Sequence, residues 1–282
     1  MKVLSWNVLS KNAPQMPVRG NENVMADATV ATRAAGLERL IAGENPDLIG
    51  FQELSPPWRD WLRDHPVSGY GMVGGHTENT GEAGFIFYRS GRYRPLFSGV
   101  FWLADGAPET PTVGWDARFD RICTYALFEA LPSGKRFLML DTHLDHEGKA
   151  ARPNQAQTVL SRIGALRERA EKEFGAADCP VILVGDMNST PDSEVYRLYT
   201  ERLCNARAAA AETLPADLCT SPGFHWCGSA ADLSRRGHVI DYIFVSPNVR
   251  AERYGMICTA TNLCPYGPFL SDHNAVWAQL SF

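Results

Sequence analysis

Five polar clusters in this chain follow apolar segments that are typical of strands. Gly185-Asp186-Met187-Asn188 is the plainest of them, because an Asp and an Asn directly after a buried strand can orient a water molecule for attack on a phosphoester. Taken alone, this segment is equally compatible with a turn and a helix cap. The other four clusters are Trp6-Asn7, Gln52-Glu53, Thr142 to His146, and Ser271-Asp272-His273.

Together, the five clusters supply oxygen ligands and no cysteine. Oxygen ligands suit a hard divalent cation, so the sequence predicts Mg²⁺ or Mn²⁺ as the cofactor. Zinc is disfavoured, since His143, His146 and His273 form no His-x-x-x-His pair and no cysteines have the Cys-x-x-Cys spacing.

The elements that position these clusters follow from hydrophobic periodicity. The first sixty residues predict strand 2–9, a helix from Val30 to Asn45-Pro46, strand 47–51 and a helix opened by Ser55-Pro56. Strands are then expected at 84–88, 93–103, 122–130 and 136–141, followed by a helix that ends near Gly175.

The second half of the chain repeats this order. Strand 180–184 precedes a helix opened by Thr190-Pro191, and after an irregular stretch from about 205 to 237 come strands 239–245 and 275–280. Two such halves predict an α/β fold, a four-layer αββα sandwich of two packed mixed sheets flanked by helices. No linker separates the halves, so we expect a single domain over residues 1–282.

Composition limits the substrates and the location. The chain has 282 residues, 45% of them hydrophobic, and a net charge of −5 with dispersed Lys and Arg, which disfavours a long nucleic-acid duplex. The sequence has no transmembrane segment and does not start like a signal peptide, so we expect a cytoplasmic protein. No obligate protein partner is evident.

The ordered set of motifs resembles the endonuclease/exonuclease/phosphatase superfamily, which includes deoxyribonuclease I and the inositol-polyphosphate 5-phosphatases. The resemblance rests on Trp6-Asn7, Gln52-Glu53, Thr142-His143, Gly185-Asp186-x-Asn188, Ile240-Asp241-Tyr242 and Ser271-Asp272-His273. Further segments, among them Gly114-Trp115-Asp116-Ala117, resemble a bacterial branch of metal-dependent hydrolases. The resemblance implies the deoxyribonuclease I-like sandwich, with its site between the sheets.

The resemblance also implies residue roles. Glu53, Asn7 and Asp272 match metal ligands, and Asp186 and Asn188 match the residues that activate and position water. Asp241 matches the partner that orients a catalytic His273. His143 matches a second catalytic histidine, with Glu82 as its hydrogen-bond partner. Asp145 and His146 either stabilise a turn or support the residues of the site from behind, or contact the substrate directly.

Substrate-binding residues are expected in a separate part of the sequence. Arg121 is the main candidate for a phosphate clamp, because a guanidinium binds phosphate in a bidentate manner. Trp115, Asp116 and His76 are the other candidates. Arg118 and Arg152 are further possible clamps, although a surface charge explains each of them as well.

The sequence therefore predicts a Mg²⁺- or Mn²⁺-dependent hydrolase, either a phosphodiesterase or a phosphatase, in which metal-activated water attacks a small phosphorylated substrate. One alternative is a nuclease that acts on short nucleic acid, at single-stranded or terminal DNA or RNA. A different class of answer is a catalytically silent binding module with the same fold.

Overall fold

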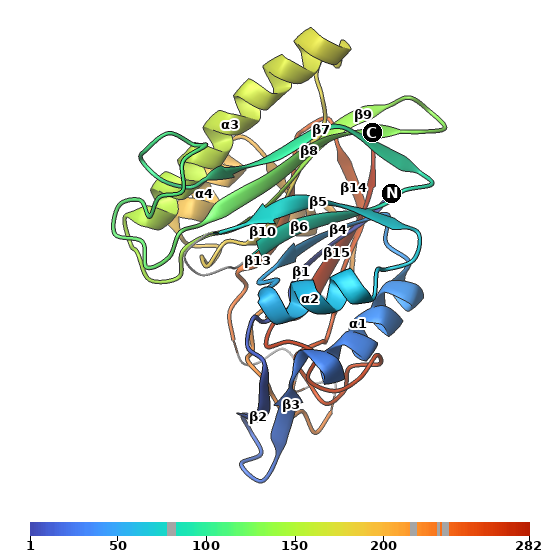
Figure 1. Ribbon diagram of the computed structural model, residues 1–282, viewed down its shortest axis with the longest axis vertical. Helices are drawn as coiled ribbons and strands as arrows, with labels where there is room; N and C mark the ends of the chain where they lie inside the picture. The colour runs from blue at the N-terminus through green and yellow to red at the C-terminus, as the bar shows by residue number, and fades with distance from the viewer. Residues whose placement is uncertain (78–82, 215–218, 230–231, 233–236) are drawn as a thin grey trace.

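The computed structural model describes residues 1–77, 83–214, 219–229, 232 and 237–282. Two large sheets lie against each other, and helices cover the outer face of each (Figure 1). Both sheets mix parallel and antiparallel pairs. The predicted four-layer sandwich is therefore confirmed, whereas the single domain stays a prediction.

The first sheet contains the start and the end of the described chain. Its seven strands run in the order β12 (Glu212–Leu214), β14 (Arg250–Ile257), β15 (Ala275–Ser281), β1 (Lys2–Asn7), β4 (Leu48–Gln52), β6 (Ala83–Arg89) and β5 (Tyr70–His76). β1 pairs with β15 on one side in an antiparallel manner and with β4 on the other in a parallel manner. The central strand thus joins elements from both ends of the sequence.

The second sheet is formed by the middle of the chain. Its order is β11 (Cys204–Asn205), β13 (Asp241–Val245), β10 (Val181–Asp186), β9 (Arg136–His143), β8 (Ile122–Ala130) and β7 (Tyr93–Trp102). A small separate hairpin, β2 (Ala13–Pro17) with β3 (Met25–Ala28), extends from the first half. The parallel β9–β10 pair places the carboxyl ends of both strands at the same sheet edge.

Helices α1 (Val30–Glu44) and α2 (Pro56–Asp64) cover the first sheet, and α3 (Ala151–Phe174) and α4 (Glu194–Thr200) cover the second (Figure 1). A single turn, α5 (Ala206–Ala209), lies beside β11. The helix α1 ends as predicted at Asn45, which adopts a left-handed conformation with φ 50° and donates its N–H to the carbonyl of Ile41.

The start of α2 agrees with the prediction, because Ser55 occupies the N-cap position and Pro56 is the first helical residue. The Ser55 hydroxyl, however, donates to the Ser10 carbonyl at 2.9 Å and makes no capping hydrogen bond to α2. The start of α4 differs from the prediction. Thr190-Pro191 does not open α4, because the Ser193 N–H closes a turn on the Thr190 carbonyl and the Ser193 hydroxyl caps the helix that begins at Glu194.

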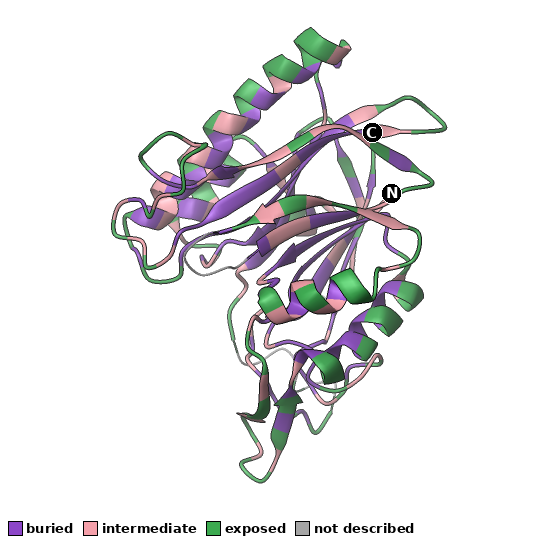
Figure 2. Cartoon of the chain, viewed as in Figure 1, coloured by how far each residue is buried: buried purple, intermediate pink, exposed green. Residues whose placement is uncertain are grey.

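Apolar side chains fill three layers, and much of the strands that contribute them is coloured as buried in Figure 2. One core lies between the sheets, and one lies between each sheet and its helices. The sheets approach so closely at Gly50 that an added Cβ would lie 2.4 Å from Val184 and 2.8 Å from Asp141. At the same junction, Gln52 Nε2 donates to Asp141 Oδ1 at 2.5 Å.

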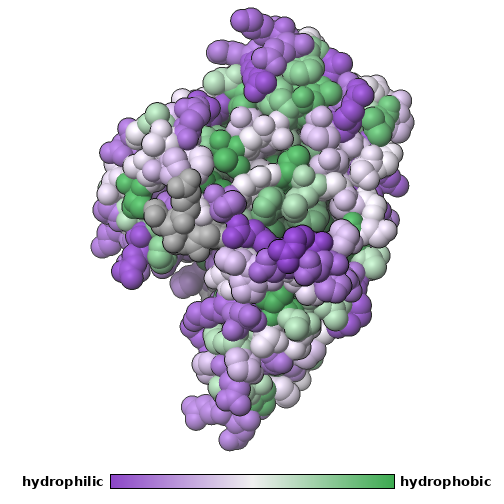
Figure 3. All heavy atoms as spheres, viewed as in Figure 1, coloured by the Kyte–Doolittle hydropathy of each residue, from purple (hydrophilic) through white to green (hydrophobic). Residues whose placement is uncertain are grey.

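The surface is mixed in character. On the face seen in Figure 3, the end of α3 is hydrophilic, in keeping with the exposed residues Glu171, Lys172 and Glu173. Within the described ranges, no helix has both the length and the apolar composition that a membrane crossing requires.

Candidate active site

Polar residues from both sheets meet at one edge of the sandwich. In the second sheet, Asp186 at the end of β10 stands in register with His143 on β9 and Asp241 on β13. In the first sheet, Asn7 ends β1 in register with Gln52 of β4, and Glu53 follows directly. Within each sheet, strand pairing therefore brings the predicted clusters to the same edge.

The Asn7 side chain links the two sheets. Its Nδ2 donates to Glu53 Oε1 at 2.9 Å and to Asp186 Oδ2 at 3.1 Å, and the side chain is fully buried. The N–H of Leu9 holds the Asn7 Oδ1 atom at 3.0 Å, which fixes the orientation of the amide. One NH₂ group thus keeps two carboxylates from opposite sheets close together.

Glu53 is held in a restricted backbone conformation. Its φ is 63°, which is uncommon for a residue with a side chain and costs about 1–3 kcal/mol. The carboxylate accepts the Ser10 N–H at 2.7 Å. Burial opposes the charged form, but the charge of His143 and the hydrogen bonds from Asn7 and Ser10 outweigh it and lower the pKa of Glu53 to about 2.

His273 and Asp241 form a buried ion pair. The two Asp241 oxygens lie 2.9 and 3.1 Å from His273 Nδ1. Burial opposes the imidazolium, yet the charges of Asp241 and Asp186 raise the pKa of His273 well above its ordinary value. Burial also raises the pKa of Asp241, to about 6. The other ring nitrogen of His273, Nε2, faces Asp186 Oδ2 at 3.7 Å.

His143 lies on the opposite side of Asp186. Arg121 Nη1 lies 3.0 Å from His143 Nδ1, and His143 Nε2 lies 3.5 Å from Asp186 Oδ2 and 3.0 Å from Asn188 Nδ2. Asn188 has a φ of 45°, and its amide also donates to the Leu144 carbonyl at 2.9 Å. Asp186 is therefore flanked by two histidines and held by the Asn188 N–H at 2.9 Å.

A cleft of about 470 Å³ opens over this arrangement. Asn7 and Asp241 lie behind its wall, from where they orient the residues that line it. The lining consists of Ser10, Lys11, Glu53, Ser55, Phe119, Arg121, His143, His146, Asp186, Asn188 and His273.

The sequence profile of the Endonuclease/Exonuclease/phosphatase family matches residues 4–273, which include every residue of this cleft. The chain belongs to this family. Its members are phosphoester hydrolases, and the strand-end arrangement is consistent with the match.

Solved structures of the family share the fold over the whole chain. An endonuclease/exonuclease/phosphatase from Bacteroides vulgatus is 27% identical, with a TM-score of 0.77 and coverage of 100% of this chain and 98% of that one. The mannosyl-6-phosphatase Bt3783 of Bacteroides thetaiotaomicron is 25% identical, with a TM-score of 0.76 and full coverage of both chains.

A curated relative matches a shorter region. The carbon catabolite repressor protein 4 homolog 3 of Arabidopsis thaliana is 28% identical over 181 residues, which is 60% of this chain. The chain spans only 36% of the length of that relative.

Some predicted site residues of this family member lie away from the cleft lining. Asp116 accepts the N–H groups of Lys149, Ala150 and Ala151 at 2.7–3.2 Å, so its carboxylate caps the start of α3. Trp115 is half-buried with a φ of 54°, and His76 ends β5 with an exposed side chain.

Three other predicted residues remain. Asp272 lies beside His273, and its pKa is raised mainly by burial and further by the charges of Glu53 and Asp186. Its carboxylate is thus within electrostatic reach of the site without lining the cleft. Glu82 lies outside the described residues. Asp145 adopts the turn-stabilising role, since it accepts the backbone N–H groups of Arg118, Phe119, Glu147 and Gly148.

Sequence reasoning missed Arg33. The side chain is 1% exposed, and burial lowers its pKa to about 10. Its guanidinium donates to five backbone carbonyls, those of Val8, Leu9, Lys11, Ala28 and Leu270. Arg33 thereby holds the segment after β1, which carries the Ser10 N–H bound to Glu53. The only signal in the sequence was an Arg at a position on the apolar side of the predicted helix.

The donor set fits a hard divalent cation. Glu53 and Asp186 reach the same Asn7 NH₂ group, so their oxygens are separated by less than the sum of the two hydrogen bonds. Asp186, Asp241 and His273 also bring one ligand atom each within 4.8 Å of one another. Asp241 already pairs with His273, so a cation bound to Asp241 would compete with the imidazolium. Cation binding is therefore favoured beside Glu53 instead.

Proposed function

We propose that this chain hydrolyses phosphoester bonds of small phosphorylated molecules with the help of Mg²⁺ or Mn²⁺. The observation that carries the proposal is the Asn7 amide, which joins Glu53 and Asp186 across the two sheets at the floor of a cleft. Carboxylate oxygens without thiolates suit these cations. Family membership supports the reaction class.

In this proposal, Glu53 binds the cation directly, while Asn7 fixes the Glu53 carboxylate from behind the cleft wall and Asp272 acts from the neighbouring segment. A bound cation polarises the phosphoryl group and lowers the pKa of a coordinated water. The low pKa of Glu53 keeps its carboxylate charged over the whole physiological range. The Asn7 amide positions that carboxylate relative to Asp186.

The remaining residues act on the water and the phosphate. Asp186 accepts a hydrogen bond from the attacking water and orients it, and the Asn188 amide positions the water or a phosphate oxygen. The His273 imidazolium, kept protonated by Asp241, offsets the charge that develops on the non-bridging oxygens. In this proposal, His143 donates a proton to the leaving-group oxygen or binds phosphate.

Arg121 has two functions in this proposal. Its Nη1 orients His143 at 3.0 Å, and its guanidinium lines the cleft, where it can bind a phosphate oxygen. The nearby rings of Phe119 and His146 stack with centroids 5.5 Å apart and form an aromatic wall. This wall can pack against a sugar or a base.

A small substrate is favoured over a nucleic acid. The net charge of −5 opposes binding of a long polyanion, and the cations of the cleft are local. The likeness to a mannosyl-6-phosphatase at 25% identity points the same way. A nuclease for single-stranded or terminal DNA or RNA is the alternative, while a silent binding module is opposed by the presence of Asn7, Glu53, Asp186 and His273.

The test is hydrolysis of p-nitrophenyl phosphate, bis(p-nitrophenyl) phosphate, sugar phosphates and single-stranded oligonucleotides, with Mg²⁺, with Mn²⁺ and with EDTA. We expect activity that EDTA abolishes, and a loss of at least about 10²-fold in Asp186→Ala. Glu168→Ala, an exposed change on α3, is the matched control. Full activity of Asp186→Ala would refute the assignment, and preference for oligonucleotides would favour the nuclease.

A further inference from the structure

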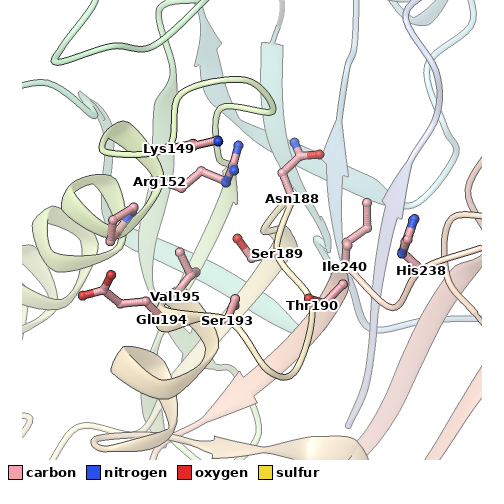
Figure 4. A pocket seen from close by; sticks show the side chains of 11 residues that line it. Lys149, Arg152, Asn188, Ser189, Thr190, Ser193, Glu194, Val195, His238 and Ile240 are labelled. Atoms are coloured by element: carbon pink, nitrogen blue, oxygen red, sulfur yellow. The ribbon is translucent and has the colours of Figure 1, made fainter.

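A second pocket of about 430 Å³ lies next to the catalytic cleft, and Asn188 lines both. Figure 4 shows Lys149, just before α3, and Arg152, in its first turn, on one side of this pocket, with Asn188 and Ser189 opposite, from the segment after β10. His238 is a further lining residue. The two cavities therefore meet at a residue that we place in the reaction.

The charge of this pocket favours an anion. Neither Lys149 nor Arg152 forms an ion pair with any residue in the described part of the chain. Arg152 Nη1 donates to the Asp145 carbonyl at 3.3 Å, which leaves its other N–H groups for a ligand. Glu194 is the opposing charge on the lining, and its carboxylate lies 4.0 Å from Arg197.

An independent observation points to a bound group. The Ser189 side chain is only 6% exposed, yet its hydroxyl has no hydrogen-bond partner among the residues described. Buried hydroxyls nearly always have a partner, so this one lacks an acceptor or donor that a ligand can supply. In Figure 4 the Ser189 oxygen points toward the side of the pocket where Lys149 and Arg152 lie.

We propose that this pocket is a second phosphate subsite and that the preferred substrate carries two phosphate groups. One phosphate is hydrolysed in the cleft, while Lys149, Arg152 and Ser189 bind the other, which does not react. A phosphate dianion matches two cations and a hydroxyl donor. The substrate part of this inference rests on the proposed phosphoester hydrolysis.

Phosphate binding is tested without turnover. Inorganic phosphate is titrated calorimetrically into the EDTA-treated chain, so that no metal contributes. We expect Lys149→Gln and Arg152→Gln each to weaken binding about tenfold, as for loss of a charge-assisted hydrogen bond, and Ser189→Ala to weaken it about threefold. Lys172→Gln, near the far end of the same helix, is the charge-matched control.

Lys149→Gln guards against a folding artefact, because its side chain is exposed. Equal affinities in the wild type, Lys149→Gln and Ser189→Ala, or no binding by the wild type at millimolar phosphate, would overturn the subsite. These results do not depend on whether the chain is an active phosphoesterase.

Substrate preference is tested with glucose 6-phosphate and glucose 1,6-bisphosphate. We expect the ratio of kcat/KM for the bisphosphate over the monophosphate to exceed one in the wild type and in Lys172→Gln, and to fall about tenfold in Arg152→Gln. Phosphate binding without this preference would refute the two-phosphate substrate alone. Absence of hydrolysis on every phosphoester tested would instead refute the proposed function.

Discussion

Replacing Arg33 with Met should destabilise the protein strongly, and the contacts of Arg33 give the magnitude. Burial lowers the pKa of Arg33 to about 10, which corresponds to a cost of roughly 3 kcal/mol for keeping the charge inside. Against this, hydrogen bonds to a charged group contribute about 1.5 kcal/mol each at the lower end, and Arg33 makes them to five carbonyls. Arg33→Met removes the cost of burying the charge together with the five hydrogen bonds, so we expect the unfolding free energy to fall by about 4 kcal/mol.

The assay is urea unfolding of Arg33→Met followed by tryptophan fluorescence and circular dichroism. Arg39→Met on the same helix is the matched control, because Arg39 is exposed and donates from Nε to the Tyr266 carbonyl at 2.9 Å. We expect the control to change the unfolding free energy by less than about 1 kcal/mol. Equal unfolding midpoints for the two variants would refute the reasoning, since the buried carbonyls would then have found other donors.

Three further changes test the site and the packing beneath it. Asp241→Asn removes the charge that raises the pKa of His273, so the alkaline limb of the kcat/KM profile should move to lower pH and activity at neutral pH should fall about 10²-fold; an unshifted limb would contradict the imidazolium role. Glu53 has its pKa lowered to about 2, so its stabilising contribution exists above pH 4.5 and disappears as the pH falls toward 2. The difference in unfolding free energy between the wild type and Glu53→Gln should shrink over that window, and a constant difference would argue against the shift. Gly50→Ala inserts a Cβ 2.4 Å from Val184, so thermal unfolding should show a loss of about 1–3 kcal/mol, and unchanged stability would mean that the sheets can separate without cost.

Many strands of the two large sheets can be predicted from the sequence, because the patterns that indicate a strand are local. An apolar run followed by a polar cluster marks β10 and Asp186, and β8 has the predicted limits of Ile122–Ala130. By contrast, β5 was not specified, because Gly71, Gly74 and Gly75 obscure its alternation. β14 (Arg250–Ile257) was missed as well, since polar and apolar residues alternate only partly there.

The candidate site is predictable in its residue types but not in its contacts. Strand ends identify Asn7, Glu53 and Asp186, whereas the sharing of one Asn7 amide by two carboxylates depends on how closely the two sheets pack. Asp116 shows the opposite case, because its carboxylate meets the start of α3, which lies more than thirty residues away in the sequence. Arg33 likewise contacts the carbonyl of Leu270, a partner that no local pattern indicates.

The position of β1 has a consequence for the order in which the protein is completed on the ribosome. β1 lies between β4 and β15, and the amino group of Met1 donates to the Leu280 carbonyl at 2.7 Å. β1 precedes β15 in the chain and therefore keeps one unpaired edge until β15 has emerged from the ribosome, after the strands of the second sheet. His273 lies just before β15, so the site cannot be assembled early. A nascent chain thus has an incomplete candidate site, and the exposed edge of β1 is a place where chaperone binding would protect the chain from aggregation.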